Sequence, residues 1–217
     1  MGKKDIKIDD RSALIVIDMQ NDFLPGGALP VPDGDAIIDG INEISKLFKE
    51  KAIVIYSQDW HPIGHGSFAS SYPDKEPGDE IDKQGVGPVL WEDHCVQNTK
   101  GAEFHDRMQD EYAICIIRKG YHKEIDSYSA FYDNDHKTST GLAGILKELK
   151  IKNVFICGVA LDYCCYFSAI DAKKEGFNVI FIKDLTKAIG NPEGIVEERL
   201  ESMKKSNIKI VNKKDII

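Results

Sequence analysis

The sequence has no long apolar run, no concentrated basic stretch and no C-x-x-C pair. We therefore expect neither a secretory signal nor a membrane-spanning helix. Its five cysteines are an odd number, which fits neither a disulfide framework nor a zinc ribbon, so we expect reduced thiols. The formal net charge of -8 argues against a phosphate-backbone ligand. These absences predict a cytoplasmic protein that binds neither nucleic acid nor a membrane.

The apolar content is ordinary for a globular protein. Hydrophobic residues make up 42% of the 217 residues, which is enough for a substantial core. That length falls within the usual range of one domain, so we expect a single domain over residues 1–217. The composition does not fix the oligomeric state and allows a homo-oligomer.

Short runs rich in Val and Ile alternate with amphipathic stretches along the chain. This alternation predicts a three-layer αβα fold of the Rossmann-like kind, with a six-stranded, mostly parallel sheet covered by helices on both sides. The strands are expected at 13–18, 52–56, 113–117, 154–158, 179–182 and 208–211, and the helices around 37–48, 142–149, 161–175 and 195–203.

One stretch breaks the alternation. From Ser57 to about Tyr112 the sequence is rich in Gly, Pro, His and Trp and is far longer than an ordinary connection. Long loops of this kind tend to carry function. We expect a metal-binding loop at about 57–112.

Four chemically active residues follow four different predicted strands: Asp18, Asp59, Lys119 and Cys164. Since the carboxyl ends of parallel strands meet at one edge of a sheet, these side chains should converge on one crevice. Their shared position is more informative than any one of them.

Cys164 follows a glycine-containing turn and should lie in or near the first turn of a helix. Free N–H groups and the helix dipole there favour a thiolate and suit an oxyanion. Asp18 is placed to accept the thiol proton, and the charge of Lys119 would lower the thiol pKa. Taken singly, each residue has a commoner reading: a buried core cysteine, a carboxylate that caps a turn, and an exposed lysine. Cys165 should face away from the crevice.

Asp59, His61 and His94 form a candidate metal site of the two-histidine, one-carboxylate kind. Zinc is the first choice, and iron and manganese accept the same ligands. The alternative is that these three are ordinary polar residues of a loop. His65 is a fourth ligand, a neighbour that supports the ligands, or a bystander.

Three aromatic residues lie near these positions in the sequence: Phe23, Trp91 and Tyr128. They are candidate walls for a flat ring, although packing in the core is the commoner role of an aromatic side chain.

Together these residues resemble the nicotinamidase/pyrazinamidase branch of the isochorismatase-like cysteine hydrolases. The resemblance covers nearly the whole chain in family order. It rests on VIDMQNDF (16–23), SQDWHP (57–62), WEDHCV (91–96), RKGYHKEIDSYSAF (118–131) and GVALDYCC (158–165).

The resemblance implies a catalytic triad of Asp18, Lys119 and Cys164, and a divalent metal held by Asp59, His61 and His94. It also implies a cis peptide bond at Val159-Ala160, with the backbone N–H groups of Ala160 and Cys164 directed at the oxyanion.

The activity it implies is hydrolysis of nicotinamide to nicotinate and ammonia through a cysteine thioester in NAD salvage, with pyrazinamide as a second substrate. In such enzymes the metal engages the ring nitrogen, and Phe23 and Trp91 match ring-packing residues; Tyr128 and Ala160 are expected to line the same site. Two alternatives stay open: a related hydrolase acting on another small amide, such as a carbamoyl or ureido compound, and a catalytically silent metal-binding relative.

Overall fold

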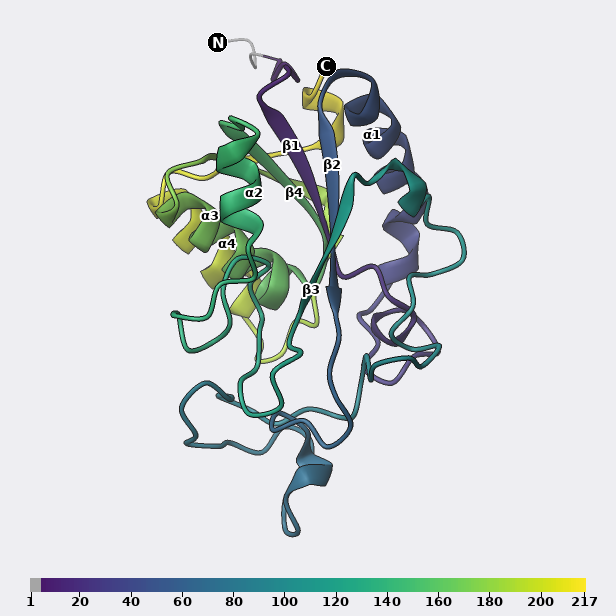
Figure 1. Ribbon diagram of the computed structural model, residues 1–217, viewed down its shortest axis with the longest axis vertical. Coiled ribbons are helices and arrows are strands. Elements are labelled where there is room, and N and C mark those ends of the chain that lie inside the picture. The colour runs from purple at the N-terminus through teal and green to yellow at the C-terminus, as the bar shows by residue number, and fades with distance from the viewer. Residues whose placement is uncertain (1–4) are drawn as a thin grey trace.

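The computed structural model describes residues 5–217. Its centre is one sheet of six strands in the order β3-β2-β1-β4-β5-β6, in which every neighbouring pair is parallel (Figure 1). The strands are β1 (Ser12–Ile17), β2 (Ile53–Asp59), β3 (Cys115–Lys119), β4 (Asn153–Val159), β5 (Asn178–Lys187) and β6 (Lys209–Val211). The α-helices are α1 (Ile38–Lys51), α2 (Leu142–Glu148), α3 (Tyr166–Lys174) and α4 (Ile195–Lys205).

The apolar runs form strands that are buried on both faces. Along β1, Leu14 and Val16 join the core on one face of the sheet, while Ala13, Ile15 and Ile17 join the core on the other. Alternate residues of a strand point to opposite faces, so a continuous apolar run fits a sheet that is covered on both sides.

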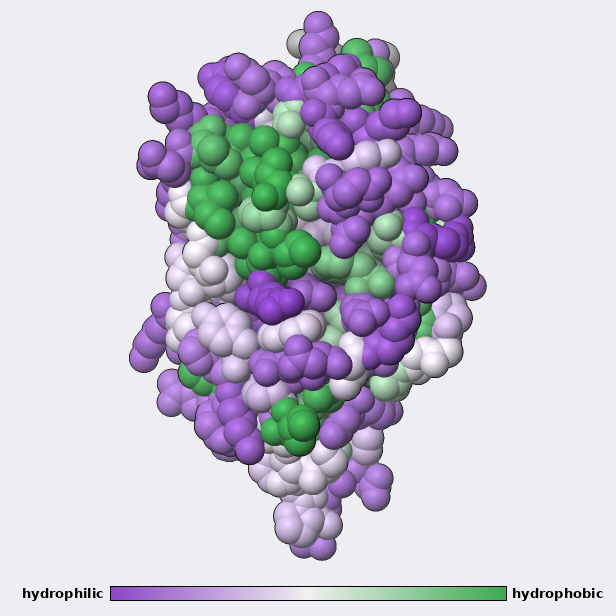
Figure 2. Space-filling view, turned by 45° about the vertical axis from the view of Figure 1, so that its right-hand side comes forward, coloured by the Kyte–Doolittle hydropathy of each residue, from purple (hydrophilic) through white to green (hydrophobic). Residues whose placement is uncertain are grey.

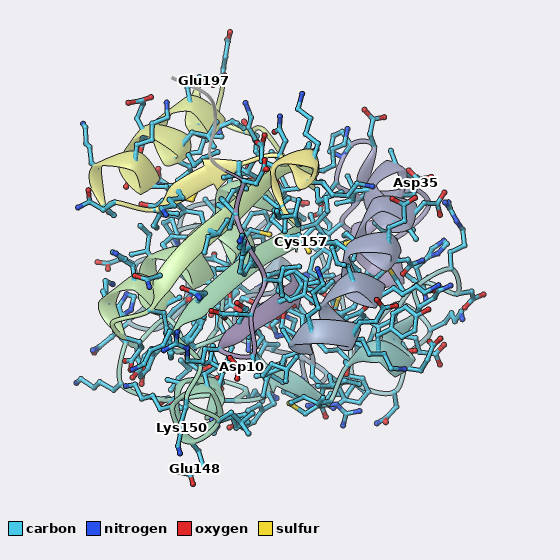
Figure 3. All side chains as sticks on the ribbon, turned by 90° about the horizontal axis from the view of Figure 1, so that it is seen from above. Asp10, Asp35, Glu148, Lys150, Cys157 and Glu197 are labelled. Atoms are coloured by element: carbon cyan, nitrogen blue, oxygen red, sulfur yellow. The ribbon has the colours of Figure 1, made fainter. Side chains whose placement is uncertain are left out.

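The two faces carry different helices. α1 covers one face, and α2, α3 and α4 cover the other (Figure 1). Viewed from above, the sheet runs between these two layers, and Cys157 of β4 lies on the α1 side of it (Figure 3). The predicted three-layer αβα fold and its mostly parallel sheet are confirmed.

All six strands end at the same edge of the sheet, and the long connection between β2 and β3 lies beyond that edge (Figure 1). This connection holds only two short 3₁₀ turns, Ala69–Ser71 and Asp110–Tyr112. It begins later than predicted, because β2 continues through Ser57 and Gln58 to Asp59, so these polar residues belong to a strand.

No helix within residues 5–217 combines the length and the apolar character that crossing a membrane requires.

Candidate active site

Asp18 is the first residue after β1. It is fully buried and has a backbone φ of 47°, a left-handed conformation that aspartate tolerates better than most residues. Ser57 Oγ donates a hydrogen bond to Asp18 Oδ1 over 2.6 Å. The second carboxylate oxygen, Oδ2, lies 2.9 Å from Lys119 Nζ in an ion pair.

Lys119 is the last residue of β3 and is fully buried at the centre of this group. Its Nζ contacts both Asp18 and Asp59, donates to Ser127 O over 2.9 Å and lies 3.5 Å from Cys164 Sγ. Burial lowers the pKa of Lys119, but the two carboxylates raise it further, so that the net pKa is well above its usual value. Lys119 therefore remains an ammonium group that joins three other reactive side chains.

Cys164 lies at the end of a turn that follows β4. Its Sγ and carboxylate oxygens of Asp18 and Asp59 all lie within 4.8 Å of one another. The turn, Leu161–Cys165, has π-helical geometry, with Cys165 N donating to Ala160 O over 3.0 Å, and α3 begins only at Tyr166. The expected first turn of a regular helix is thus a wider turn that precedes the helix.

Burial outweighs the charge of Lys119 in the resting site, although that charge lowers the pKa of the Cys164 thiol, as expected. Burial raises the pKa of Cys164 well above its usual value; Lys119 lowers it by less, and Asp18 and Asp59 raise it again. Desolvation disfavours the charged thiolate more than one nearby cation favours it. The resting residue is a thiol, and it needs a base beside it.

The environment of Asp18 makes its carboxylate a suitable base for this thiol. Burial raises the pKa of Asp18, Lys119 lowers it by less and Asp59 raises it further. A carboxylate with a raised pKa binds a proton more readily than one in water. Oδ2 accepts no well-aligned hydrogen bond from the residues that the structure describes.

Asp59, His61 and His94 form a second buried group that shares Asp59 with the first. One ligand atom from each lies within 4.8 Å of the others, and all three side chains are buried. Asp59 Oδ2 lies 3.7 Å from His61 Nε2, while the other carboxylate oxygen contacts Lys119. Two imidazoles and one carboxylate suit zinc, iron or manganese.

Backbone carbonyls orient both imidazoles of this group. His61 Nδ1 bonds to Gly120 O over 2.9 Å and His94 Nδ1 bonds to Glu92 O over 2.7 Å, which leaves Nε2 of each ring for a metal. Burial and the neighbouring His61 lower the pKa of His94 to about 4, so His94 is neutral near pH 7. Burial raises the pKa of Asp59, but Lys119 and His61 lower it more. A neutral imidazole and an ionised carboxylate are the forms that bind metal, so the residues fit a divalent ion.

His65 has no free ring nitrogen for this site. Its Nδ1 bonds to Ser67 Oγ over 2.7 Å and its Nε2 bonds to His122 O over 3.0 Å. Its ring lies against that of His61, with the centroids 4.3 Å apart. His65 therefore packs against the candidate ligand His61 and is not part of the group of Asp59, His61 and His94.

A small pocket opens onto both groups. Phe23, Trp91 and Tyr128 all line it, and Trp91 Nε1 donates to Tyr128 Oη over 3.1 Å. The empty volume of the pocket is about 380 Å³, including the part that is open to solvent. The full lining is Phe23, Leu29, Asp59, Trp91, His94, Asp126, Tyr128, Ala160, Tyr163, Cys164 and Ile189. Cys165 is fully buried and is absent from this lining, as expected.

The peptide bond between Val159 and Ala160 is cis, as the family resemblance implies. Ala160 and Cys164 lie at the same end of the pocket, between β4 and α3.

Comparison with known proteins decides the family. The family model described as the isochorismatase domain matches residues 12–215. The chain belongs to the isochorismatase family.

Within the isochorismatase family, several of the most similar proteins are named nicotinamidase or pyrazinamidase. A protein of Acinetobacter baylyi named nicotinamidase is 44% identical over 98% of this chain and 97% of its own length. A solved structure of an Acinetobacter baumanii nicotinamidase and pyrazinamidase has a TM-score of 0.91 at 43% identity, covering 95% of this chain and 98% of that one. A Pyrococcus horikoshii pyrazinamidase solved in complex with zinc has a TM-score of 0.76 at 44% identity, covering 93% and 99%. The resemblance to the nicotinamidase and pyrazinamidase branch is confirmed.

Sequence reasoning missed several residues of this isochorismatase-family site. Ser57 holds Asp18, and the side-chain amide of Gln20 bonds to both the N–H and the carbonyl of Asp59 over 2.8 Å. Asp126 lines the pocket with a buried Oδ2 that has no hydrogen-bond partner within the described residues. Tyr163 packs edge-on against Trp91, with ring centroids 5.0 Å apart. All four residues lie inside quoted motifs, which was the available signal: Gln20 in VIDMQNDF, Ser57 in SQDWHP, Asp126 in RKGYHKEIDSYSAF and Tyr163 in GVALDYCC.

Proposed function

We propose that this protein is a nicotinamidase, which hydrolyses nicotinamide to nicotinate and ammonia in NAD salvage and also accepts pyrazinamide. The observation that carries the proposal is the position of Lys119. Its ammonium joins the thiol of Cys164, the carboxylate of Asp18 and the metal-site carboxylate of Asp59 beside one pocket lined by aromatic side chains.

The first half of the reaction forms a thioester. Asp18 accepts the thiol proton as Cys164 Sγ attacks the carboxamide carbon, and the carbonyl oxygen becomes an oxyanion. We assign the N–H groups of Ala160 and Cys164 to that oxyanion. The carbon–nitrogen bond then breaks, and Asp18 returns the proton to the leaving nitrogen, so that ammonia departs.

The second half releases the acid. Water attacks the thioester carbon while Asp18 takes one of its protons, and the carbon–sulfur bond breaks. The proton then returns to the thiolate, which restores Cys164 and frees nicotinate. Lys119 remains charged throughout and balances the negative charge that moves between Asp18 and Cys164.

We assign the metal to Asp59, His61 and His94, with zinc as the first choice and iron or manganese as alternatives. When bound, the ion supplies a ligand position for the ring nitrogen of the substrate. Phe23, Trp91 and Tyr128 pack against the faces and edges of the ring and exclude water from it. A carbamoyl or ureido substrate has no ring for these aromatic walls, which favours the heteroaromatic amide.

We also propose that the protein works in the cytoplasm. Its five cysteines are free thiols, four of them buried, which suits a reducing compartment.

The test is ammonia release from nicotinamide by the wild type, by Cys164→Ala and by Cys165→Ala. We expect Cys164→Ala to lose activity by at least about 1,000-fold, because the nucleophile is gone. Cys165→Ala, the matched control, should keep most of the rate, because Cys165 does not line the pocket.

The same assay after chelation separates the metal from the thiol. Activity should fall on chelation and return when zinc is supplied. A wild-type rate no higher than that of Cys164→Ala, with metal present, would remove the proposal.

A further inference from the structure

β3 forms one edge of the sheet. It pairs with β2 on one side and, among residues 5–217, with no strand on the other. Native proteins usually protect such an edge with charge, proline or a covering segment, because an unpaired strand readily pairs with another chain. The approach to the strand and its first three residues, Ala113-Ile-Cys-Ile-Ile117, contain no charge and no proline, and the charged residues Arg118 and Lys119 stand only at its end.

This edge carries exposed apolar side chains. Ile114 is 55% exposed and Ile116 is 45% exposed, and the alternation along the strand places them on the same face. Figure 2 shows a broad hydrophobic surface on the side of the molecule where β3 comes to the front in Figure 1, bordered by hydrophilic residues. Contiguous apolar surface of this kind marks an interaction site.

We propose that the free edge of β3 pairs with β3 of a second copy of this chain. The two strands run antiparallel about a twofold axis at Cys115, so that Ile114 of each copy lies opposite Ile116 of the other. In this register both cross-strand pairs beside the axis are Ile114 with Ile116. A register centred on Ile116 would instead place each Ile114 opposite Arg118 of the other copy.

The charges around the strand favour a second copy over an unrelated partner. Glu111 precedes the strand and Arg118 lies near its end, and neither forms an ion pair among the described residues. In an antiparallel pair, Arg118 of each copy approaches the acidic turn Asp110–Tyr112 of the other. The surface is therefore complementary to itself under twofold symmetry, which is what an isologous dimer requires.

Arg118 is already held in place at the surface. Its guanidinium lies 3.8 Å from the ring centroid of Trp60, and Nε donates to Gln58 Oε1 over 3.1 Å. A side chain fixed before binding loses less conformational entropy when a partner arrives.

Pairing in this direction leaves the two pockets at opposite ends of the joined sheet. Each pocket lies beyond the carboxyl ends of its own strands, and antiparallel pairing points those ends apart. The dimer therefore forms without blocking either pocket, and its test does not depend on the proposed activity.

The oligomeric state tests the proposal, measured by sedimentation or light scattering over a range of concentrations. The wild type should show twice the mass of one chain, and Ile116→Lys should weaken the dimer by at least about tenfold, because it buries a charge at the twofold contact. Ile63→Lys is the matched control: Ile63 is 82% exposed on the long connection, so the dimer should persist. A monomeric wild type at every concentration, or a dimer that survives Ile116→Lys, overturns the proposal.

Charge reversal provides a second test that does not depend on apolar contact. Arg118→Glu alone should dissociate the dimer, and Arg118→Glu with Glu111→Arg in the same chain should restore it.

Cys115 reports the register, because it is the one cysteine that is not buried. A short bismaleimide should link two wild-type chains and fail to link Cys115→Ser or Ile116→Lys chains; failure with a dimeric wild type rejects this register.

Discussion

At the scale of residues, Lys119 is the organising side chain of the site. It is a fully buried cation that forms ion pairs with the carboxylates of Asp18 and Asp59, and its Nζ lies 3.5 Å from the thiol of Cys164. Removing one partner of such a group leaves an uncompensated buried charge, which is strongly destabilising. The residue thus contributes to the fold as well as to the proposed chemistry.

The identities of the proposed site residues were readable from the sequence, but their protonation was not. Their positions at strand ends and the order of the motifs predicted that Asp18, Lys119 and Cys164 lie close together. Burial raises the pKa of the Cys164 thiol more than Lys119, as expected, lowers it, and the sequence does not show how completely water is excluded around Cys164.

Ser57 gives a test of the proposed base at this scale. Asp18 must be ionised to accept the thiol proton, so activity falls as the pH drops through its pKa. Burial raises that pKa and the hydrogen bond from Ser57 lowers it, so Ser57→Ala should raise it again. We expect the acidic limb of the kcat/KM profile to move upward by about one pH unit.

The measurement is kcat/KM for nicotinamide across the acidic range. Ser45→Ala is the control, since Ser45 is equally buried but lies on α1. An acidic limb that stays in place in Ser57→Ala would show that Asp18 is not the group that titrates.

At the scale of elements, all six strands were predicted near their observed positions because each is a short apolar run. Differences arise where polar residues continue a strand. β5 extends to Lys187 although Lys183 and Asp184 interrupt its apolar run, and its pairing with β4 shifts register at Ile156/Gly158. The π-helical turn before α3 was also missed, since its residues have no periodicity that distinguishes it from an ordinary helix.

Gly158 tests how closely the end of β4 packs against β1. A Cβ at Gly158 would lie 2.1 Å from the carbonyl oxygen of Ile17, and its φ of +114° disfavours other residues. Gly158→Ala should therefore force β4 away from β1 and cost more than about 3 kcal/mol.

The control is Gly176→Ala, where φ is +92° but nothing lies within 4 Å of the added atom. It should cost only about 1–2 kcal/mol, the conformational penalty alone. Urea unfolding measures both variants, and equal losses would contradict a steric role for Gly158.

At the scale of the whole molecule, the layer architecture was predicted, but only part of the pocket wall was. The alternation of strands and helices decides which edge of the sheet carries the site. The pocket wall also includes Leu29, Asp126 and Ile189, which come from three separate connections. Nothing in the local sequence of these residues shows that they meet, because their contacts depend on the folded chain.

Metal binding should be visible in the stability of the whole chain. Zinc at a thousand times its dissociation constant should add about 4 kcal/mol to the free energy of unfolding, or roughly 10 °C in Tm. We propose that residues 1–217 form one domain, so tryptophan fluorescence and far-UV circular dichroism should report one transition that a chelator moves down. In His94→Ala the chelator should have little effect; an unchanged wild-type Tm would contradict the metal assignment.

Because one ammonium contacts both the Asp18 and the Asp59 carboxylates, binding of an ion at the proposed metal site would be thermodynamically linked to ionisation of the Cys164 thiol. An ion held by Asp59 would draw charge from that carboxylate and would leave Lys119 freer to favour a thiolate at Cys164. Linkage is reciprocal, so the factor by which zinc increases the thiolate population equals the factor by which thiolate formation increases the affinity for zinc. With the proposed metal bound, the reactivity of the Cys164 thiol would therefore depend on whether the metal site is filled.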